Sequence, residues 1–137
     1  MFNFKKGNTE ATSFTKLTLR LSGMRSTEEY EIVCQGETSE CAQYLIFYSK
    51  DGDRRKLEKS VQRPTDMVLE LLNRCSVMRW DGFSGSNPRG VRDGWMFTLT
   101  AEINGEKIYA SGSNNYPRHY REFMDGFKTL LSDEEIQ

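Results

Sequence analysis

The sequence predicts a single α+β domain, in which a mostly antiparallel sheet of about six strands carries two helices packed on one face. Three observations predict this class. Segments with strand periodicity are joined by hairpin turns, two segments have helical periodicity, and no strand–helix–strand crossover is visible. The elements follow the order ββββ-α-ββ-α. The chain of 137 residues fits one domain, residues 1–137, with residues 1–12 and 132–137 expected to fray.

The first three expected strands lie in the N-terminal part of the chain. Residues 14–21 alternate apolar and polar side chains, as a half-buried strand does, and residues 30–34 repeat the pattern. A polar loop is expected over residues 35–42. Residues 44–48 are apolar at every position, which predicts a strand in the middle of the sheet.

A turn, a charged strand and a helix are expected next. Asp51 and Gly52 form a favourable hairpin turn, because both tolerate a positive φ angle. The charged segment 54–61 is typical of a strand at the edge of a sheet. Pro64 then opens a helix. The apolar stripe of this helix consists of Met67, Val68, Leu71, Leu72, Cys75 and Met78.

The segment from Arg79 to Gly94 has no periodicity and is long for a connection inside a compact domain. We expect it to be ordered, because exposing both Trp80 and Phe83 would leave a large apolar surface in water. Trp80 should pack beneath the end of the second hairpin, with its indole N–H bound to a backbone or amide acceptor.

The second hairpin is predicted with its register. Asn104-Gly105 is the strongest two-residue turn signal, and a tight turn there puts the apolar residues on one face. The expected partners are Ile103 and Glu106, Ala101 and Ile108, Leu99 and Ala110, Glu102 and Lys107, Thr100 and Tyr109, and Trp95 and Asn114. A last helix is expected from Pro117 to Leu131, with Pro117 in its first turn.

Composition excludes several classes of protein. The net charge of −1 and the pI of about 5.9 give no field of one sign, so nucleic acid is not an expected partner. No apolar run is long enough for a membrane span, and the first residues do not resemble a signal peptide. A cytoplasmic location is therefore expected, although an exported protein whose leader had been removed would have the same sequence.

The sequence offers no catalytic or metal-binding set. Three cysteines without a signal peptide favour reduced thiols, and Cys34 and Cys75 are expected to be small core residues. Cys34 and Cys41 lack zinc-ligand spacing. The only histidine, His119, is expected on the surface, and no nucleophile motif, phosphate loop or dinucleotide fingerprint is present. No catalytic residue, metal or cofactor is assigned.

The residues best suited to recognition gather in three stretches, 79–83, 93–95 and 112–117. The pairing of the second hairpin brings them to one end of the sheet, where the last helix starts with free N–H groups. Together they form a candidate pocket for a small polar or anionic ligand, or a surface for a protein partner. The candidate residues are Trp80, Asp81, Arg92, Trp95, Asn114, Tyr116, Arg118 and His119. A purely structural interpretation stays open, in which the tryptophans plug the end of the core and Asn114 caps the helix.

The second half of the chain resembles a group of bacterial domains with no known activity. The motifs that carry the resemblance are Trp80-Asp81-Gly82-Phe83, Asp93-Gly94 before an aromatic strand, and Gly112-Ser113-Asn114-Asn115-Tyr116-Pro117. The match covers about residues 78–131. In the pattern of that group the aromatic residue stands two residues further along, at Phe97, so Trp95 is a departure. The resemblance implies a single domain with ordered loops and adds no chemistry.

Two functions from different classes follow as expectations. The first is a non-catalytic binding or interaction module, whose recognition surface is formed by loop 79–94 and turn 112–118, because tryptophan, tyrosine and arginine suit recognition. The alternative is a small hydrolase or transferase that uses Asp81 or Asp93 with His119. The alternative requires a carboxylate within hydrogen-bond reach of His119 in a cleft.

Overall fold

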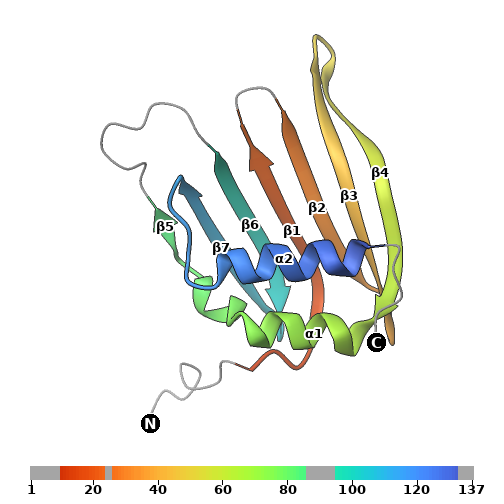
Figure 1. Cartoon of the computed structure of the whole chain (residues 1–137), viewed down its shortest axis with the longest axis vertical. Helices are drawn as coiled ribbons and strands as arrows, with labels where there is room; N and C mark the ends of the chain where they lie inside the picture. The colour runs from red at the N-terminus through yellow and green to blue at the C-terminus, as the bar shows by residue number, and fades with distance from the viewer. Residues whose placement is uncertain (1–9, 24–25, 86–94, 133–137) are drawn as a thin grey trace.

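Seven strands form one sheet, and two α-helices pack on one of its faces (Figure 1). The structure is a computed structural model that describes residues 10–23, 26–85 and 95–132. The strand order is β4-β3-β2-β1-β6-β7-β5, antiparallel throughout except for the parallel pair of β5 and β7. The predicted fold class and element order are confirmed. The strand beyond the predicted six is β5, a two-residue strand inside the segment expected to be a loop.

The elements have the following bounds: β1 Phe14–Ser22, β2 Thr27–Cys34, β3 Thr38–Ser49, β4 Gly52–Pro64, α1 Thr65–Arg74, the 3-10 helix η2 Val77–Trp80, β5 Ser84–Gly85, β6 Met96–Ile103, β7 Glu106–Ser113 and α2 Tyr120–Leu131.

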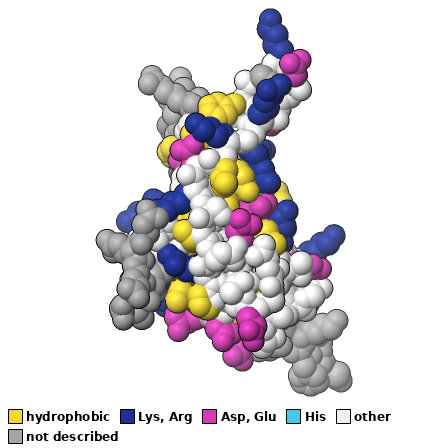
Figure 2. Space-filling model, turned by 90° about the vertical axis from the view of Figure 1, so that its right-hand side faces the viewer, with side chains coloured by type: hydrophobic (Ala, Val, Ile, Leu, Met, Phe, Trp, Pro, Cys, Tyr) yellow, Lys and Arg dark blue, Asp and Glu magenta, His cyan; other side chains and the backbone are white. Residues whose placement is uncertain are grey.

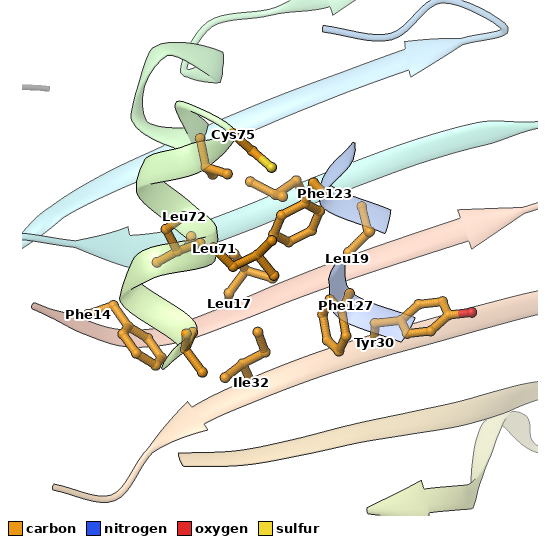
Figure 3. Packing of buried hydrophobic residues seen from close by; sticks show 14 of the residues in the cluster. Phe14, Leu17, Leu19, Tyr30, Ile32, Leu71, Leu72, Cys75, Phe123 and Phe127 are labelled. Atoms are coloured by element: carbon orange, nitrogen blue, oxygen red, sulfur yellow. The ribbon is translucent and has the colours of Figure 1, made fainter. Parts of the chain in front are cut away.

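The core lies between the helices and the sheet face beneath them. Leu17 and Leu19 of β1 are fully buried there, because strand alternation turns both side chains to the same face. Phe123 and Phe127 of α2 and the leucines of α1 cover this face (Figure 3). Gly126 lets the helices meet, since a Cβ atom at this position would collide with Leu71.

The opposite face of the sheet is polar and is crossed by a network of ion pairs. Lys16 meets Glu31 at 3.3 Å, Arg55 meets Glu29 at 2.7 Å and Glu31 at 3.5 Å, and Arg20 meets Glu29 at 3.7 Å. Within the described residues, no helix lies on this face (Figure 1).

The β6–β7 hairpin has the register predicted for it. Every predicted pair from Ile103–Glu106 to Leu99–Ala110 is present. Asn104 and Gly105 have φ angles of 55° and 77°, as the primed turn requires. The Asn104 side chain also accepts hydrogen bonds from the amides of Thr12 and Ser13. The Glu10 carbonyl accepts a bond from Asn104 and the Ala11 amide donates to Asn73, so residues 10–12, which were expected to fray, are held in place, whereas residues 1–9 lie outside the described residues.

The polar loop predicted over residues 35–42 is confined to residues 35–37, and the prediction was wrong for residues 38–42. β3 begins at Thr38, and both Cys41 and Ala42 are buried. The polar residues of this stretch are compatible with a strand because they find partners: Ser39 bonds the Thr65 hydroxyl at 2.8 Å, and Glu40 accepts a bond from Ser60 at 2.8 Å. Cys75 is fully buried as predicted, whereas Cys34 is only half-buried.

The distal half of the β3–β4 hairpin, residues 44–57, extends beyond the helices, and we call it the projecting hairpin (Figure 1). β4 is an edge strand, as predicted. Residues 44–48 lie inside the sheet between β2 and β4, as predicted, but their burial does not extend to the distal end, where Phe47 is 49% and Tyr48 63% exposed. The turn residues are Lys50 and Asp51, one position earlier than predicted, since Ser49 pairs with Gly52.

The last helix begins at Tyr120 and not at the predicted Pro117. His119 has a φ angle of 69°, which no α-helix accommodates, and the Tyr120 amide donates to the Pro117 carbonyl in a turn.

Of the helices in the described ranges, none is long and apolar enough to cross a membrane.

Candidate functional site

Trp80 is the buried floor of the predicted site. Its side chain is packed edge-on against Phe123, with ring centroids 5.4 Å apart, and only 3% of the residue is exposed. The indole Nε1–H donates to the Arg118 carbonyl at 3.0 Å, so the predicted backbone acceptor is confirmed. Trp80 therefore ties η2 to the turn that precedes α2.

Asp81 and the two residues after it are hydrogen-bonded to the backbone of β7. Its Oδ1 accepts the Tyr109 amide at 2.9 Å, and the Gly82 amide donates to the Tyr109 carbonyl at 2.8 Å. The Ser111 amide then donates to the Phe83 carbonyl. Because its carboxylate is bonded to the β7 backbone, Asp81 has a structural role that the sequence did not reveal.

Trp95 and Asn114 face each other across the hairpin, as predicted. The Asn114 amide donates to the Trp95 carbonyl at 2.9 Å, and the Trp95 amide donates to Asn114 Oδ1 at 3.2 Å. The Trp95 ring packs over Gly23, where a Cβ atom would lie 2.8 Å from it. Asn114 therefore closes the end of the hairpin and is not the helix cap considered above, which is His119.

Tyr116 belongs to an aromatic stack. Its ring lies 4.5 Å from that of Tyr120 and 5.5 Å from that of Phe97, and the residue is 37% exposed. Burial, helped by the neighbouring Tyr116, raises the pKa of the Tyr120 hydroxyl well above its ordinary value. Tyr120 therefore stays neutral over the physiological range of pH.

A cleft of about 400 Å³ opens between η2 and the turn 117–119. Its lining residues are Ser76, Arg79, Trp80, Phe83, Pro117, Arg118 and His119. Arg79 and Arg118 are exposed and His119 is half-exposed, whereas Trp80 is buried. The lining thus combines two guanidinium groups and an imidazole with an aromatic floor, and contains no acidic side chain.

Two residues of this cleft have strained backbones. Ser76 and His119 have φ angles of 54° and 69°, in the left-handed region that serine and histidine seldom adopt. Ser76 follows α1 and His119 precedes α2, so each strained residue stands at the end of a helix that packs in the core. Strained residues that a fold maintains are found disproportionately at binding sites.

His119 meets a carboxylate other than those predicted. Its Nδ1 lies 2.8 Å from Glu122 Oε1, one helical turn further along α2. Both side chains are accessible, with 34% and 54% of their surfaces exposed. Asp81 is bonded elsewhere, and Asp93 lies outside the described residues, as does Arg92.

The structure therefore brings together part of the predicted set. Trp80, Arg118 and His119 line one cleft, and Tyr116 lines an adjoining cavity along α2 with Arg118 and His119. Asp81, Trp95 and Asn114 have the separate contacts described above and do not line the cleft. The predicted set omitted Ser76, because the helix was expected to continue past it to Met78 and nothing in the sequence indicated the left-handed residue there. Glu122 was also missed, although its spacing from His119 could have indicated it.

No set of metal ligands is assigned, because in the described ranges no three His, Cys, Asp or Glu residues come together. No protein-family model matches the chain, and no curated protein is detectably similar to it.

Proposed function

We propose that the protein is a non-catalytic binding module that takes a small anionic ligand in the cleft between η2 and the turn 117–119. The observation that carries the proposal is the cleft lining, in which the guanidinium groups of Arg79 and Arg118 lie beside the aromatic floor of Trp80, while the carboxylate of Glu122 is bonded to His119 and is not part of the lining. A volume of about 400 Å³ suits a small molecule.

The chemistry of the rim favours an anion with oxygen atoms. A guanidinium group presents a planar fork of donors that matches a carboxylate or phosphate. Arg79 comes from η2 and Arg118 from the turn before α2, so a ligand between them contacts two separate segments of the chain. Within the described residues neither guanidinium forms an ion pair, so both are available to a ligand.

The cleft is also preorganised. The bond from Trp80 Nε1 to the Arg118 carbonyl fixes the backbone of the turn, and Pro117 is buried beside it. A binding site whose backbone is already fixed loses less conformational entropy when the ligand arrives.

One observation favours the alternative, a small hydrolase or transferase. The pair of His119 and Glu122 has the geometry in which a carboxylate orients an imidazole for proton transfer. The test is release of p-nitrophenol from its acetate and phosphate esters. Ester hydrolysis by the wild type that is lost in His119→Gln would support the enzyme function. If the wild type hydrolyses the esters no faster than His119→Gln does, the binding function is retained and the enzyme function is rejected.

The binding proposal is tested by fluorescence. Trp95→Phe leaves Trp80 as the sole tryptophan, since the chain has two. Titration with sodium pyrophosphate should change Trp80 emission saturably, and Arg118→Ala should weaken binding by about tenfold or more, the value of one charge-assisted hydrogen-bonded contact. Arg118→Ala leaves the carbonyl that binds Trp80 unaltered, so the fold is retained.

The matched control is Arg54→Ala, which removes an exposed guanidinium from the projecting hairpin. It should leave the affinity unchanged. Absence of a saturable signal, or an equal loss in both arginine variants, would contradict the proposal.

A further inference from the structure

The outer edge of β4 is the open edge of the sheet. Among the described strands none lies beyond β4, whereas at the opposite side of the sheet β7 is bonded to β5 and to the segment from Asp81 to Phe83. β4 is 13 residues long, and every residue from Gly52 to Glu58 is exposed. Such an edge offers a row of backbone N–H and C=O groups that can pair with another chain.

A β-bulge at Glu58 decides which side chains flank this edge. Gln43 pairs with Lys59, but the next residue of β3, Tyr44, pairs with Leu57, so Glu58 is the extra residue. Because side chains alternate along a strand, one extra residue exchanges the two faces of β4 between its base and its distal half.

The two faces of distal β4 therefore differ in chemistry. Arg54 and Lys56 lie on the side that bears the helices, where Arg54 is opposite Phe47. Arg55 and Leu57 lie on the other side, and Leu57 is 51% exposed. Both faces are accessible, because the projecting hairpin extends beyond the helices (Figure 1).

The projecting hairpin is basic. Residues 44–57 contain four basic and two acidic side chains, a net charge of +2 in a chain whose total is −1. Figure 2 looks onto the β4 edge and shows Lys and Arg side chains along it with hydrophobic side chains between them. Arg55 is occupied by Glu29 and Glu31, whereas Lys50, Arg54 and Lys56 form no ion pair within the described part of the chain.

We propose that the distal edge of β4 binds an extended acidic peptide, which adds to the sheet as a further strand. Peptide side chains on the helix side meet Arg54 and Lys56 and are acidic. Those on the other side meet Leu57 and are apolar. The favoured ligand is therefore a segment in which acidic and apolar residues alternate, and it is bound independently of the anion cleft.

A second copy of the chain is disfavoured at this edge, because pairing two β4 strands would bring like charges together. Nucleic acid is disfavoured because it has no backbone amides that could pair along the open edge of β4, so only the charge of the hairpin would attract it.

The test uses a fluorescein-labelled, acetylated heptapeptide of alternating glutamate and valine, with binding followed by anisotropy. The Arg54→Glu/Lys56→Glu variant should bind it at least tenfold more weakly than the wild type. The control Arg121→Glu/Lys128→Glu makes the same change of charge on the exposed surface of α2 and should bind it like the wild type.

Two further probes separate strand addition from charge attraction. A peptide N-methylated at every residue loses the backbone donors of both edges but keeps its charge, and it should bind at least tenfold more weakly to the wild-type protein. Equal binding of the methylated peptide would overturn the proposal, and so would equal weakening by both charge-reversal variants. If a labelled twelve-nucleotide oligothymidylate binds more tightly than the peptide, and this binding is lost in Arg54→Glu/Lys56→Glu, the edge binds nucleic acid and the proposal is wrong. Dimerisation through β4 without peptide binding would instead assign the edge to a second copy of the chain.

Discussion

The two edges of the sheet are finished in opposite ways. On the side of the sheet that ends in β5, the segment after η2 is bonded to β7, and Trp80 is buried against α2. At the β4 edge, the projecting hairpin holds Phe47 and Tyr48 in solvent. The difference teaches that an aromatic residue outside the core helices is buried where a backbone partner anchors it, as the Arg118 carbonyl anchors Trp80, and stays exposed where no described segment covers it.

The largest loss of stability should come from truncating Trp80. Trp80→Ala should destabilise the protein by about 3–5 kcal/mol, the usual range for truncating a buried large aromatic side chain. Chemical denaturation followed by circular dichroism measures this loss. An unchanged unfolding midpoint would mean that Trp80 is not part of the core.

The second largest effect on stability should come from the buried Cys41 in β3, the strand that runs from the base of the sheet into the projecting hairpin. Burial raises the pKa of the Cys41 thiol from 9.0 to about 11. A raised pKa gives a contribution to stability that is complete below pH 9 and is lost as the pH rises towards 11, in all about 3 kcal/mol. Between pH 8 and pH 11 the wild type should lose more unfolding free energy than Cys41→Ala does. Parallel losses in the two proteins would contradict this.

A smaller loss of stability is expected when the hydrogen bond between Asp81 and β7 is removed. Asp81→Ala removes the acceptor of the Tyr109 amide and should cost about 1 kcal/mol, because the bond is exposed to solvent. Hydrogen exchange at the Tyr109 amide should become faster. Asp81→Asn keeps an acceptor oxygen and should retain most of the protection, so equal exchange in both variants would rule out the hydrogen bond as the cause.

The smallest effect is expected at the open edge. Phe47→Ala should change the free energy of unfolding by no more than about 0.5 kcal/mol, since the side chain is 49% exposed. A loss comparable to that of Trp80→Ala would show that the two edges do not differ.

The same contrast explains which parts of the fold the sequence could predict. The β6–β7 register followed from the Asn104-Gly105 turn and from local alternation, which need no knowledge of the rest of the chain. The start of β3 could not be predicted in this way, because the polar residues Ser39 and Glu40 fit a strand only through their hydrogen bonds to Thr65 of α1 and Ser60 of β4. Polar residues that are satisfied by distant partners have no local signal.

The candidate site was predicted in part for a related reason. Arg118 and His119 were expected near Trp80, since the chain order places all three at one end of the second hairpin. Ser76 could not be expected there, because its place depends on a left-handed backbone at the end of α1 that serine does not signal. The structural role of Asp81 likewise depends on the approach of η2 to β7.

The most direct test of the central claim is an amide chemical-shift titration of the wild-type protein with inorganic pyrophosphate. If the cleft binds anions, the amides of residues 76–80 and 117–119 should shift together and saturate, while those of residues 44–57 stay in place. Absence of saturable shifts at the cleft, or larger shifts on the projecting hairpin, would contradict the claim.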